Sequence, residues 1–331
     1  MTGTSRLLRS GCPMPSIGLG TFGSDRYDEK TVAEAVREGI RLGYRLIDCA
    51  AVYGNEASIG PILADAIRDG VPRSELFVVS KVWNDGHKPA DVLLSLAQTL
   101  KDLQLDYLDL FLIHWPFRNI HPRGAPPDFH DPSAKPYDHD DYMETWHQME
   151  RLQQAGLVRQ IGTSNMTIPK LERLIRDCRI MPAVNEMELH PTFQQPALFD
   201  FCLKHGIQPV GYSPLGSPSR PERDRTAEDI VDMEQTAIRR IGVECGWHPA
   251  QVCLKWAVQR GQIPIPFSVK PAQLAANLAV LDSAPLSEYD MAEIAKVDCD
   301  CRLIKGQVFL WNGARDWRDL WDLDGTITGR S

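Results

Sequence analysis

The sequence predicts an α/β fold, a single (β/α)8 TIM barrel spanning residues 1–331. Eight short apolar runs of strand-type residues alternate with stretches of helical periodicity. Because these runs are continuously apolar, each strand is expected to be buried on both faces, as in a parallel sheet. Eight such units in about 280 residues favour a closed barrel over an open, doubly wound sheet.

Each expected strand is a short run rich in apolar and β-branched residues that ends near a polar residue. The eight runs are SIGLGT (16–21), RLIDCA (45–50), LFVVSK (76–81), YLDLFLIH (107–114), VRQIGTSN (158–165), AVNEMELH (183–190), IQPVGYS (207–213) and IPIPFS (263–268). Helices are expected over about 55–69 and 89–103, and the helix after the fourth strand should end at Gly156. Pro89 suits a first helical turn, where its missing N–H would be unpaired anyway.

Two segments interrupt this alternation. Residues 116–139, after the fourth strand, are rich in Pro, His and Asp and are not expected to form a packed element. Residues 302–331 follow the last predicted helix and include Trp311. Long loops in a compact domain are usually functional, so this loop and this tail are expected to close over the barrel mouth.

A glycine-rich motif near the N-terminus matches the glycine spacing of a dinucleotide-binding turn. Gly18, Gly20 and Gly23 fit Gly-x-Gly-x-x-Gly, but they lie where the first strand passes into a loop. Ser24-Asp25-Arg26 follows instead of a packed helix start. The sequence therefore argues against this fingerprint, which requires a strand, a turn and a helix in direct succession.

The overall composition excludes several classes of function. A formal net charge of -8 disfavours nucleic acids and anionic membranes as partners. No run approaches the roughly 18 apolar residues of a membrane span, and no signal peptide is evident. The eight Cys form no Cys-x-x-Cys pair, so we expect separate thiols, Cys299 and Cys301 included, and no metal site. We expect a cytoplasmic protein, monomeric or weakly homo-oligomeric.

Ionisable residues close three of the predicted strands on one face of the barrel. Asp48, Lys81 and His114 follow apolar runs, and Tyr53 lies five residues beyond Asp48. Each residue alone is more often structural, but catalytic groups in such barrels come from the carboxyl ends of several strands. Their joint occurrence therefore predicts an active site.

These four residue types suggest acid–base chemistry. A buried Lys81 needs a partner, and Asp48 can supply it. An ammonium near Tyr53 is expected to lower the pKa of the phenol, which would make it a useful acid or base. His114 can steady a carbonyl oxygen as negative charge develops. None of these side chains supplies electrons, so the site requires a redox cofactor.

The stretches IDCAAVYGNE, VSKVWN and LFLIHWP closely resemble the aldo-keto reductases. The resemblance extends from GLGTFG near Gly18 to IPFSVKPAQLAAN near Asn277. It assigns the family's tetrad to Asp48, Tyr53, Lys81 and His114. It implies an NAD(P)-dependent oxidoreductase that interconverts aldehydes or ketones and alcohols, with the cofactor extended across the barrel mouth.

The resemblance also implies a set of cofactor-binding positions. Ser164 and Asn165 would bind the carboxamide, Tyr212 would stack on the nicotinamide, and Ser213, Leu215 and Ser217 would cover the pyrophosphate. The full set is Thr21, Ser164, Asn165, Glu186, Tyr212, Ser213, Leu215, Ser217, Ile265, Ser268, Val269, Lys270, Gln273 and Asn277.

Two departures from the family pattern bear on the cofactor. Glu186 stands where the family usually has Gln, so it would either accept from the carboxamide and favour the oxidised ring, or pair elsewhere. Phe267 and Gln273 replace the Lys and Arg of NADP-using members, whereas Lys270 stands close to the expected phosphate. We expect NAD(H) use or dual specificity.

Aromatic residues are expected to form the substrate pocket. Phe22, Trp83 and Trp115 follow three of the strands and should rim the mouth, with Trp311 from the tail. Small aldehydes, aldoses, ketones and their alcohols all remain open as substrates. An alternative function is a nicotinamide-binding regulatory subunit on the same barrel. A metal-dependent hydrolase is disfavoured because no His-x-His follows the first strand.

Overall fold

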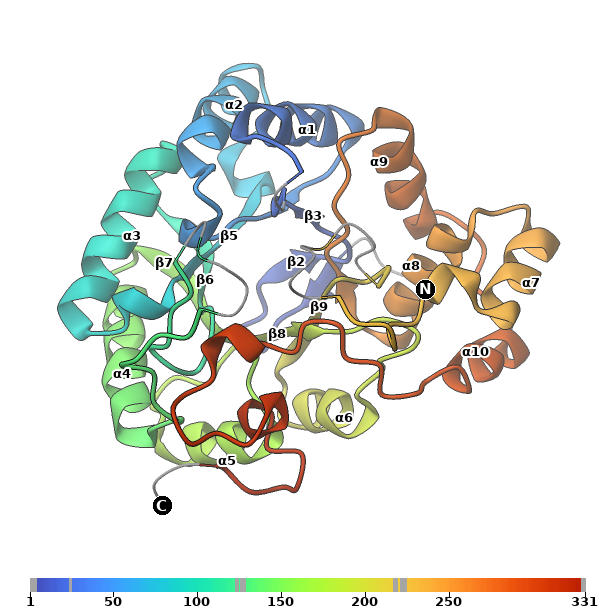
Figure 1. Cartoon of the computed structure of the whole chain (residues 1–331). Helices are drawn as coiled ribbons and strands as arrows, with labels where there is room; N and C mark the ends of the chain where they lie inside the picture. The colour runs from blue at the N-terminus through green and yellow to red at the C-terminus, as the bar shows by residue number, and fades with distance from the viewer. Residues whose placement is uncertain are drawn as a thin grey trace.

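A parallel eight-stranded sheet forms the centre of the computed structural model, which describes residues 5–23, 26–122, 125, 129–216, 220 and 225–328. Its strands pair in chain order: β3 (Leu19–Gly20), β4 (Leu46–Asp48), β5 (Phe77–Val82), β6 (Leu108–Ile113), β7 (Val158–Ser164), β8 (Val184–Glu188), β9 (Gln208–Tyr212) and β10 (Ile263–Pro264). The amides of Gly18 and Gly20 donate to the carbonyls of Pro264 and Pro266, both at 3.0 Å, and thereby close the sheet. The eight predicted strands and the barrel are confirmed (Figure 1).

Helices surround the sheet on its outside (Figure 1). They are α1 (Glu29–Leu42), α2 (Glu56–Arg68), α3 (Pro89–Leu103), α4 (His139–Gln154), α5 (Ile168–Asp177), α6 (Pro196–Lys204), α7 (Thr236–Cys245), α8 (Pro249–Arg260), α9 (Pro271–Leu278) and α10 (Glu288–Ala295). Short 3-10 turns are η1 (Ala51–Tyr53), η2 (Arg73–Glu75), η3 (Asn84–Gly86), η5 (Asp232–Glu234), η6 (Ala279–Leu281), η7 (Gln307–Phe309) and η8 (Trp317–Leu320). The predicted helix start at Pro89 is confirmed, and α4 ends just before Gly156, whose φ is +76°.

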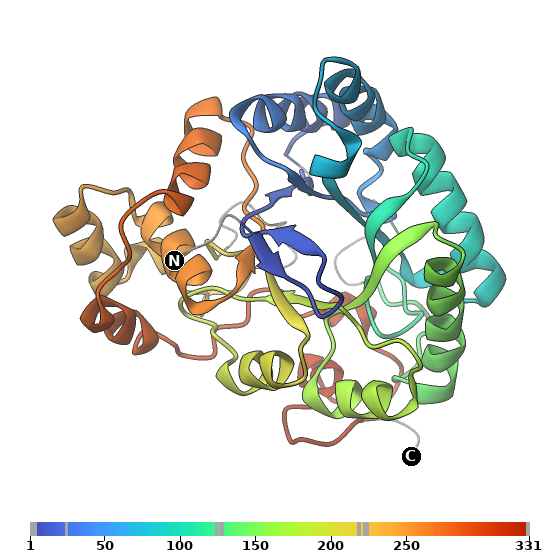
Figure 2. The same cartoon turned by 180° about the vertical axis from the view of Figure 1, so that it is seen from behind.

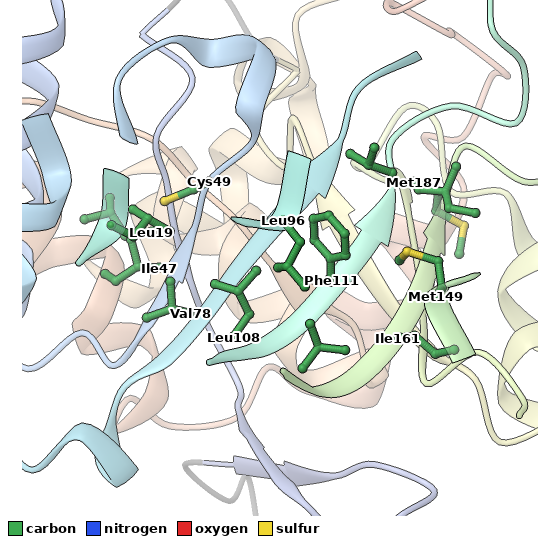
Figure 3. Packing of buried hydrophobic residues seen from close by; sticks show 14 of the residues in the cluster. Leu19, Ile47, Cys49, Val78, Leu96, Leu108, Phe111, Met149, Ile161 and Met187 are labelled. Atoms are coloured by element: carbon green, nitrogen blue, oxygen red, sulfur yellow. The ribbon is translucent and has the colours of Figure 1, made fainter. Parts of the chain in front are cut away.

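The alternation of side chains along each strand divides the core into two layers. The outer layer lies between strands and helices, where Ile47, Val78 and Phe111 meet residues such as Leu96 and Met149 (Figure 3). The inner layer fills the barrel with Leu46, Phe77, Val79, Leu110, Leu112, Val184, Val210, Ile263 and Ile265. The barrel is therefore a packed core.

An antiparallel hairpin that the sequence did not predict closes the amino-terminal end of the barrel. It consists of β1 (Ser5–Leu7) and β2 (Pro13–Pro15) and crosses the barrel bottom (Figure 2). Leu8 and Met14 are buried and pack against the inner layer. The hairpin thus forms a floor, and the polar strand ends lie at the opposite, open end.

The tail after α10 crosses the carboxyl end of the barrel beside β8 (Figure 1). Phe309, Leu320 and Trp321 from the tail pack on Trp115 and Phe117, which lie at the start of the long loop after β6. The described part of that loop contains turns and no regular element before α4, as predicted. In the described ranges, no helix combines the length and apolarity needed to traverse a bilayer.

Candidate active site

Polar side chains form a layer directly above the apolar interior of the barrel. Four residues each stand two positions after a side chain of the inner layer: Asp48 on β4, Lys81 on β5, His114 directly after β6, and Glu186 on β8. Because every second residue of a strand faces the same side, these four side chains continue the inward-facing rows towards the barrel mouth. The strand ends therefore bring together polar groups from distant parts of the sequence.

Lys81 lies at the centre of this layer and is fully buried. Its Nζ donates to Oδ1 and Oδ2 of Asp48 at 2.8 and 2.7 Å and to the carbonyl of Cys49 at 3.1 Å. The predicted Lys81–Asp48 pair is confirmed. A second carboxyl, that of Glu186, has Oε1 at 3.3 Å from the same Nζ.

The charges in this cluster influence one another strongly. Burial alone would lower the pKa of Lys81, but Asp48 and Glu186 raise it well above its usual value. Burial raises the pKa of Asp48, an effect that Lys81 opposes. Burial and the charge of Asp48 raise the pKa of Glu186 to about 8. Lys81 is therefore an ammonium at neutral pH, and Glu186 is the carboxyl that retains a proton.

Tyr53 stands at the end of η1, above this cluster. Its ring centroid lies 5.1 Å from that of Phe22 and 5.8 Å from that of His114, and Lys81 Nζ lies 5.3 Å from it. The predicted effect of Lys81, which lowers the pKa of Tyr53, is confirmed, but the expected net lowering is wrong. Burial raises the pKa of the phenol and outweighs the opposing effect of Lys81. Tyr53 therefore remains protonated and is suited to donate a proton.

His114 faces Tyr53 from the end of β6. Its ring lies edge-on to Trp83, with a centroid separation of 5.1 Å. Burial, with the charge of Lys81 adding to it, lowers the pKa of His114 well below its usual value. Among the described residues, its buried Nδ1 has no hydrogen-bond partner. The imidazole is therefore neutral, and a proton on Nε2 leaves only an acceptor unpaired at Nδ1.

Ser164, Asn165 and Tyr212 form a hydrogen-bonded group beside β8. The Tyr212 hydroxyl donates to Asn165 Oδ1 at 2.7 Å, and Asn165 Nδ2 donates to Ser164 Oγ at 3.1 Å and to the His114 carbonyl at 2.9 Å. Asn165 has a left-handed backbone, with φ of +59°. These contacts fix the Tyr212 ring next to the cluster around Lys81, and Ser164 pairs with Glu186 between β7 and β8.

The segment between β10 and α9 lies at the other end of the predicted cofactor site. Phe267 packs edge-on against Tyr27, with centroids 5.8 Å apart. Ser268 Oγ donates to Gln273 Oε1 at 2.7 Å and accepts from the Lys270 amide at 3.0 Å. An open hollow of 490 Å³ separates this segment from α1, and Val269 is among its lining residues.

The other predicted cofactor positions are distributed around the mouth. Thr21 is buried and its hydroxyl donates to the Asp48 carbonyl at 2.8 Å. Ser213 has φ of +51°, and Leu215 is partly buried. Ile265 and Asn277 are buried. Ser217 lies outside the described residues.

The four aromatic residues predicted for the substrate pocket, called the aromatic wall below, differ in their exposure. Phe22 is 45% exposed, whereas Trp115 is 6% exposed and lies under Phe309 and Trp321 of the tail. Trp83 and Trp311 are partly buried and pack on the same aromatic cluster. Trp115 is therefore packed beneath the tail. Phe22 packs against Tyr53, and Trp83 packs against His114.

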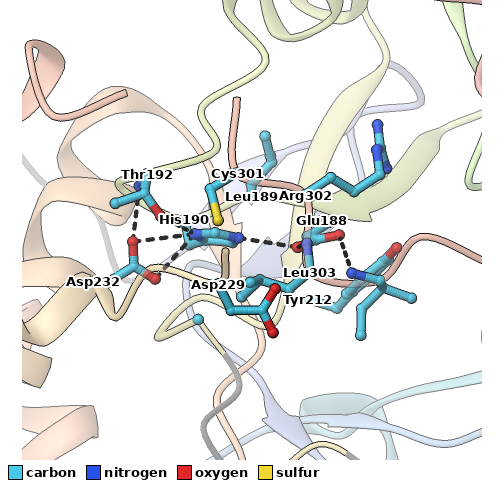
Figure 4. A network of polar contacts seen from close by, with 12 residues as sticks. Glu188, Leu189, His190, Thr192, Tyr212, Asp229, Asp232, Cys301, Arg302 and Leu303 are labelled. Atoms are coloured by element: carbon cyan, nitrogen blue, oxygen red, sulfur yellow. Dashed lines mark hydrogen bonds and ion pairs between the residues drawn. The ribbon is translucent and has the colours of Figure 1, made fainter. Parts of the chain in front are cut away.

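A buried ionic network, which the sequence did not predict, holds the first part of the tail (Figure 4). Glu188 accepts from the amides of Leu303 and Ile304 at 2.8 and 3.0 Å and contacts His190 Nε2 at 3.0 Å. His190 Nδ1 lies 3.0 Å from Asp232 of η5. Burial would lower the pKa of His190, but the two carboxylates raise it to about 9. A charged imidazole thus joins β8, the segment after β9 and the tail.

A second buried ion pair holds the distal part of the tail. Lys170 Nζ, at the start of α5, donates to Asp322 Oδ2 at 2.6 Å and to the Leu320 carbonyl at 2.9 Å. Thr167 donates to the same carboxylate. Lys170 and Asp322 are both almost completely buried. The tail is therefore fixed at two points by groups from the barrel.

The charged His190 makes a testable contribution to stability. Its folded pKa of about 9 lies above the unfolded value of about 6.5, so the contribution is complete below pH 6.5 and is lost as pH rises through 9. His190→Gln should lower the free energy of unfolding by about 3 kcal/mol at pH 6 and far less at pH 9.5. Urea unfolding of the cofactor-free protein measures this difference.

The exposed His130 provides the matched control for that measurement. His130→Gln removes the same side chain but should leave the free energy of unfolding within about 0.5 kcal/mol at both pH values. A His190→Gln penalty that stayed constant between pH 6 and 9.5 would contradict a charged imidazole between Glu188 and Asp232.

Comparisons with known proteins place the chain among the aldo/keto reductases. The model of the aldo/keto reductase family matches residues 16–298. An aldo/keto reductase of Synechocystis sp. is 42% identical over 317 residues, 95% of each chain. The aldo-keto reductase family 1 member A1 of Xenopus tropicalis is 41% identical over 299 residues, covering 90% of this chain and 89% of that protein. A Bombyx mori aldo-keto reductase, solved in complex with NADP, is 34% identical with a TM-score of 0.79, covering 91% of this chain and 94% of the other.

Proposed function

The chain belongs to the aldo/keto reductase family, and on this basis we propose that it reduces aldehydes or ketones to alcohols, and catalyses the reverse reaction, with NAD(P)(H) as cofactor. The observation that carries the proposal is the convergence of Tyr53, Lys81, Asp48 and His114 at the open end of the barrel. These groups can donate a proton and stabilise negative charge on oxygen, which carbonyl reduction requires.

The polar groups around the mouth fit a nicotinamide dinucleotide. Tyr212 offers an aromatic ring held in place by Asn165, and Ser164 and Asn165 offer hydroxyl and amide groups for a carboxamide. Lys270, which directly precedes α9, offers a cation for phosphate at the other end. The cofactor would supply the hydride, which no side chain can provide.

Tyr53 is the proposed proton donor to the carbonyl oxygen. When the proton leaves, a phenolate remains close to the Lys81 ammonium, which stabilises it. The two hydrogen bonds from Lys81 to Asp48 fix the position of the ammonium, and the carboxylate keeps it charged in a buried place. Lys81 and Asp48 thus act through Tyr53.

His114 is the proposed orienting group for the substrate carbonyl. As a neutral imidazole with its proton on Nε2, it can donate one hydrogen bond to the oxygen without competing with Tyr53 as an acid. Trp83 packs against its ring and limits the directions in which this donor can point. Phe22 and Trp83 provide apolar surface for the remainder of a small carbonyl substrate.

A matrix of the four cofactors NADH, NADPH, NAD and NADP against small aldehydes, ketones and polyols tests the proposed function. We expect oxidation of a reduced cofactor with at least one class of carbonyl compound. Tight cofactor binding without turnover of any compound would instead favour the regulatory-subunit function that the sequence left open.

We further propose that the enzyme uses NAD(H) at least as well as NADP(H). Two positions that hold cations in the NADP-using pattern hold uncharged residues here, and both make other contacts. Phe267 packs on Tyr27, and Gln273 accepts from Ser268. Lys270 is exposed and carries the one positive charge among the positions 265–277. A 2′-phosphate would therefore have fewer charge-assisted hydrogen bonds here than in the family pattern.

Substitutions at these positions should change the cofactor preference. Each charge-assisted bond is worth about 1.5–3 kcal/mol, or roughly ten- to a hundredfold in affinity. The double variant Phe267→Lys/Gln273→Arg introduces two such donors and should shift the preference towards NADPH by at least the factor for one bond. Lys270→Ala should weaken NADPH binding and spare NADH binding. Fluorescence titration with both reduced cofactors measures these affinities.

The exposed Lys101 on α3 provides a control for charge removal far from the site. Lys101→Ala should leave both affinities unchanged. A wild-type preference for NADPH above about a hundredfold, with no effect of Lys270→Ala, would show that other residues hold the phosphate.

A further inference from the structure

Glu186 has a contact with Lys81 that its place in the sequence did not reveal. The Lys81 ammonium donates to the carboxylate of Asp48 and to the carbonyl of Cys49. Glu186 Oε1 lies 3.3 Å from the same Nζ, so its carboxyl makes a second, longer contact with the ammonium. Its side chain is buried, with 4% of its surface exposed.

We propose that Glu186 is a positioning residue that acts through Lys81, and that its ionisation weakens the support that Lys81 gives to the Tyr53 phenolate. This inference rests on the proposed function, because it concerns the proton step of carbonyl reduction. It predicts that reduction slows when Glu186 loses its proton.

The charges around Glu186 explain why it retains a proton near neutral pH. Lys81 on β5, Asp48 on β4, Tyr53 on η1 and Tyr212 on β9 are the titratable groups that face it from neighbouring elements, and Glu188 follows on its own strand. Lys81 is the one cation of this group, and Asp48 already neutralises it. An ionised Glu186 would therefore leave the buried cluster with an excess negative charge.

A hydrogen bond between the two carboxyls completes this arrangement. The protonated Glu186 shares its proton with the carboxylate of Asp48, which raises the pKa of Glu186 further, after burial and the charge of Asp48. Like charges so close together are not both ionised readily in a buried place. The pKa of about 8 places the change of charge within the pH range of an ordinary assay.

The ionisation of Glu186 affects the reaction through the proton that Tyr53 donates. In reduction, the Tyr53 O–H bond breaks and its proton moves to the carbonyl oxygen; the bound cofactor would supply the hydride for the new C–H bond. The phenolate that remains later regains a proton from solvent. A negative charge on Glu186 offsets the attraction between Lys81 and this phenolate and makes the proton transfer less favourable.

Glu186→Gln tests this inference because it keeps the shape but removes the titration. Glu150 supplies the matched control: it is buried, and its carboxylate accepts from the amides of Arg179 and Ile180 at 2.7 and 2.8 Å, remote from Lys81. In wild type and Glu150→Gln, kcat for reduction should fall about tenfold per pH unit above pH 8. In Glu186→Gln this decline should be absent between pH 8 and 9.5.

Unfolding of the cofactor-free protein gives a readout that does not depend on turnover. A folded pKa of about 8 lies above the unfolded value of about 4.3, so wild type should lose stability relative to Glu186→Gln as pH rises from about 5 to 8. The ratio of the two unfolding constants should change about tenfold per pH unit in this range and level off above it. Glu150→Gln should show no such slope.

The same alkaline decline in wild type and Glu186→Gln, or a flat unfolding ratio, would overturn the inference. If none of the three proteins reduces any carbonyl compound with either cofactor, the proposed function fails. The pH dependence of the ratio of unfolding constants would then still show whether Glu186 stays protonated beside Lys81. The two failures are therefore distinguishable.

Discussion

Tyr53→Phe is expected to lower kcat by at least 10²–10⁴-fold in both directions, since it removes the only proposed proton donor. Within the cluster, Asp48 and Glu186 carry carboxyl groups too, but both contact Lys81 Nζ, whereas the Tyr53 ring packs against Phe22 and His114. No other described group near His114 is both protonated at neutral pH and placed to reach a carbonyl oxygen there.

The phenylalanine variant should otherwise remain intact. The ring contact with Phe22, at a centroid distance of 5.1 Å, is retained because only the hydroxyl is lost. Fluorescence titration should therefore give cofactor dissociation constants within about twofold of wild type. Residual turnover above a few per cent of the wild-type kcat would show that another group donates the proton.

His114→Ala is expected to lower kcat/KM by roughly two to three orders of magnitude, the usual scale for the loss of one preorganised donor. The effect should appear with every carbonyl substrate, because the hydrogen bond is made to the oxygen that all of them share. Steady-state kinetics with several aldehydes and ketones measures it.

A more conservative variant separates the hydrogen bond from the packing. His114→Gln keeps an N–H donor at this place and should recover part of the loss, whereas a purely steric role beside Trp83 predicts no such recovery. Equal kcat/KM for wild type and His114→Ala with several substrates would remove His114 from the mechanism.

The barrel could be predicted because its strands carry two signals in the sequence, their apolar composition and the ionisable residues at their ends. Most are apolar runs, and several end in an ionisable residue, so the sequence reveals both the buried sheet and its functional edge. The β1–β2 hairpin could not be predicted in this way. Its three-residue strands contain Pro13 and Pro15 and have little apolar character outside Leu7 and Met14, although Leu8 and Met14 seal the barrel.

The pairing of Asp48 with Lys81 was predictable from the cost of burying an ammonium. The place of Glu186 was not, since an acid that follows an apolar strand can face either a ligand or a buried cation. The pKa of Tyr53 depends on two opposing effects, burial and the nearby charge of Lys81. The sequence shows that Lys81 is available but not how deeply the phenol is enclosed.

The network around His190 did leave a signal in the sequence. Glu186, Glu188 and His190 occupy alternate positions, so a strand must place all three on one side, and three ionisable groups on an inward face require partners. Those partners, Asp232 and the amides of Leu303 and Ile304, lie 42 to 116 residues away along the chain. Such distances place them beyond any local pattern.

The two anchor points of the tail bear on how this enzyme could be re-engineered. Between Ile304 and Leu320 the chain spans the aromatic wall, and its exposed residues are concentrated around Asn312, Gly313 and Arg315. A chimaera that exchanged the whole tail for that of a relative would leave Lys170 dependent on the new tail for the carboxylate that Asp322 supplies. An exchange confined to residues 310–316 would leave both anchors in place. Variant libraries that seek new substrates should therefore be confined to residues 310–316, because substitutions there keep both anchors of the tail.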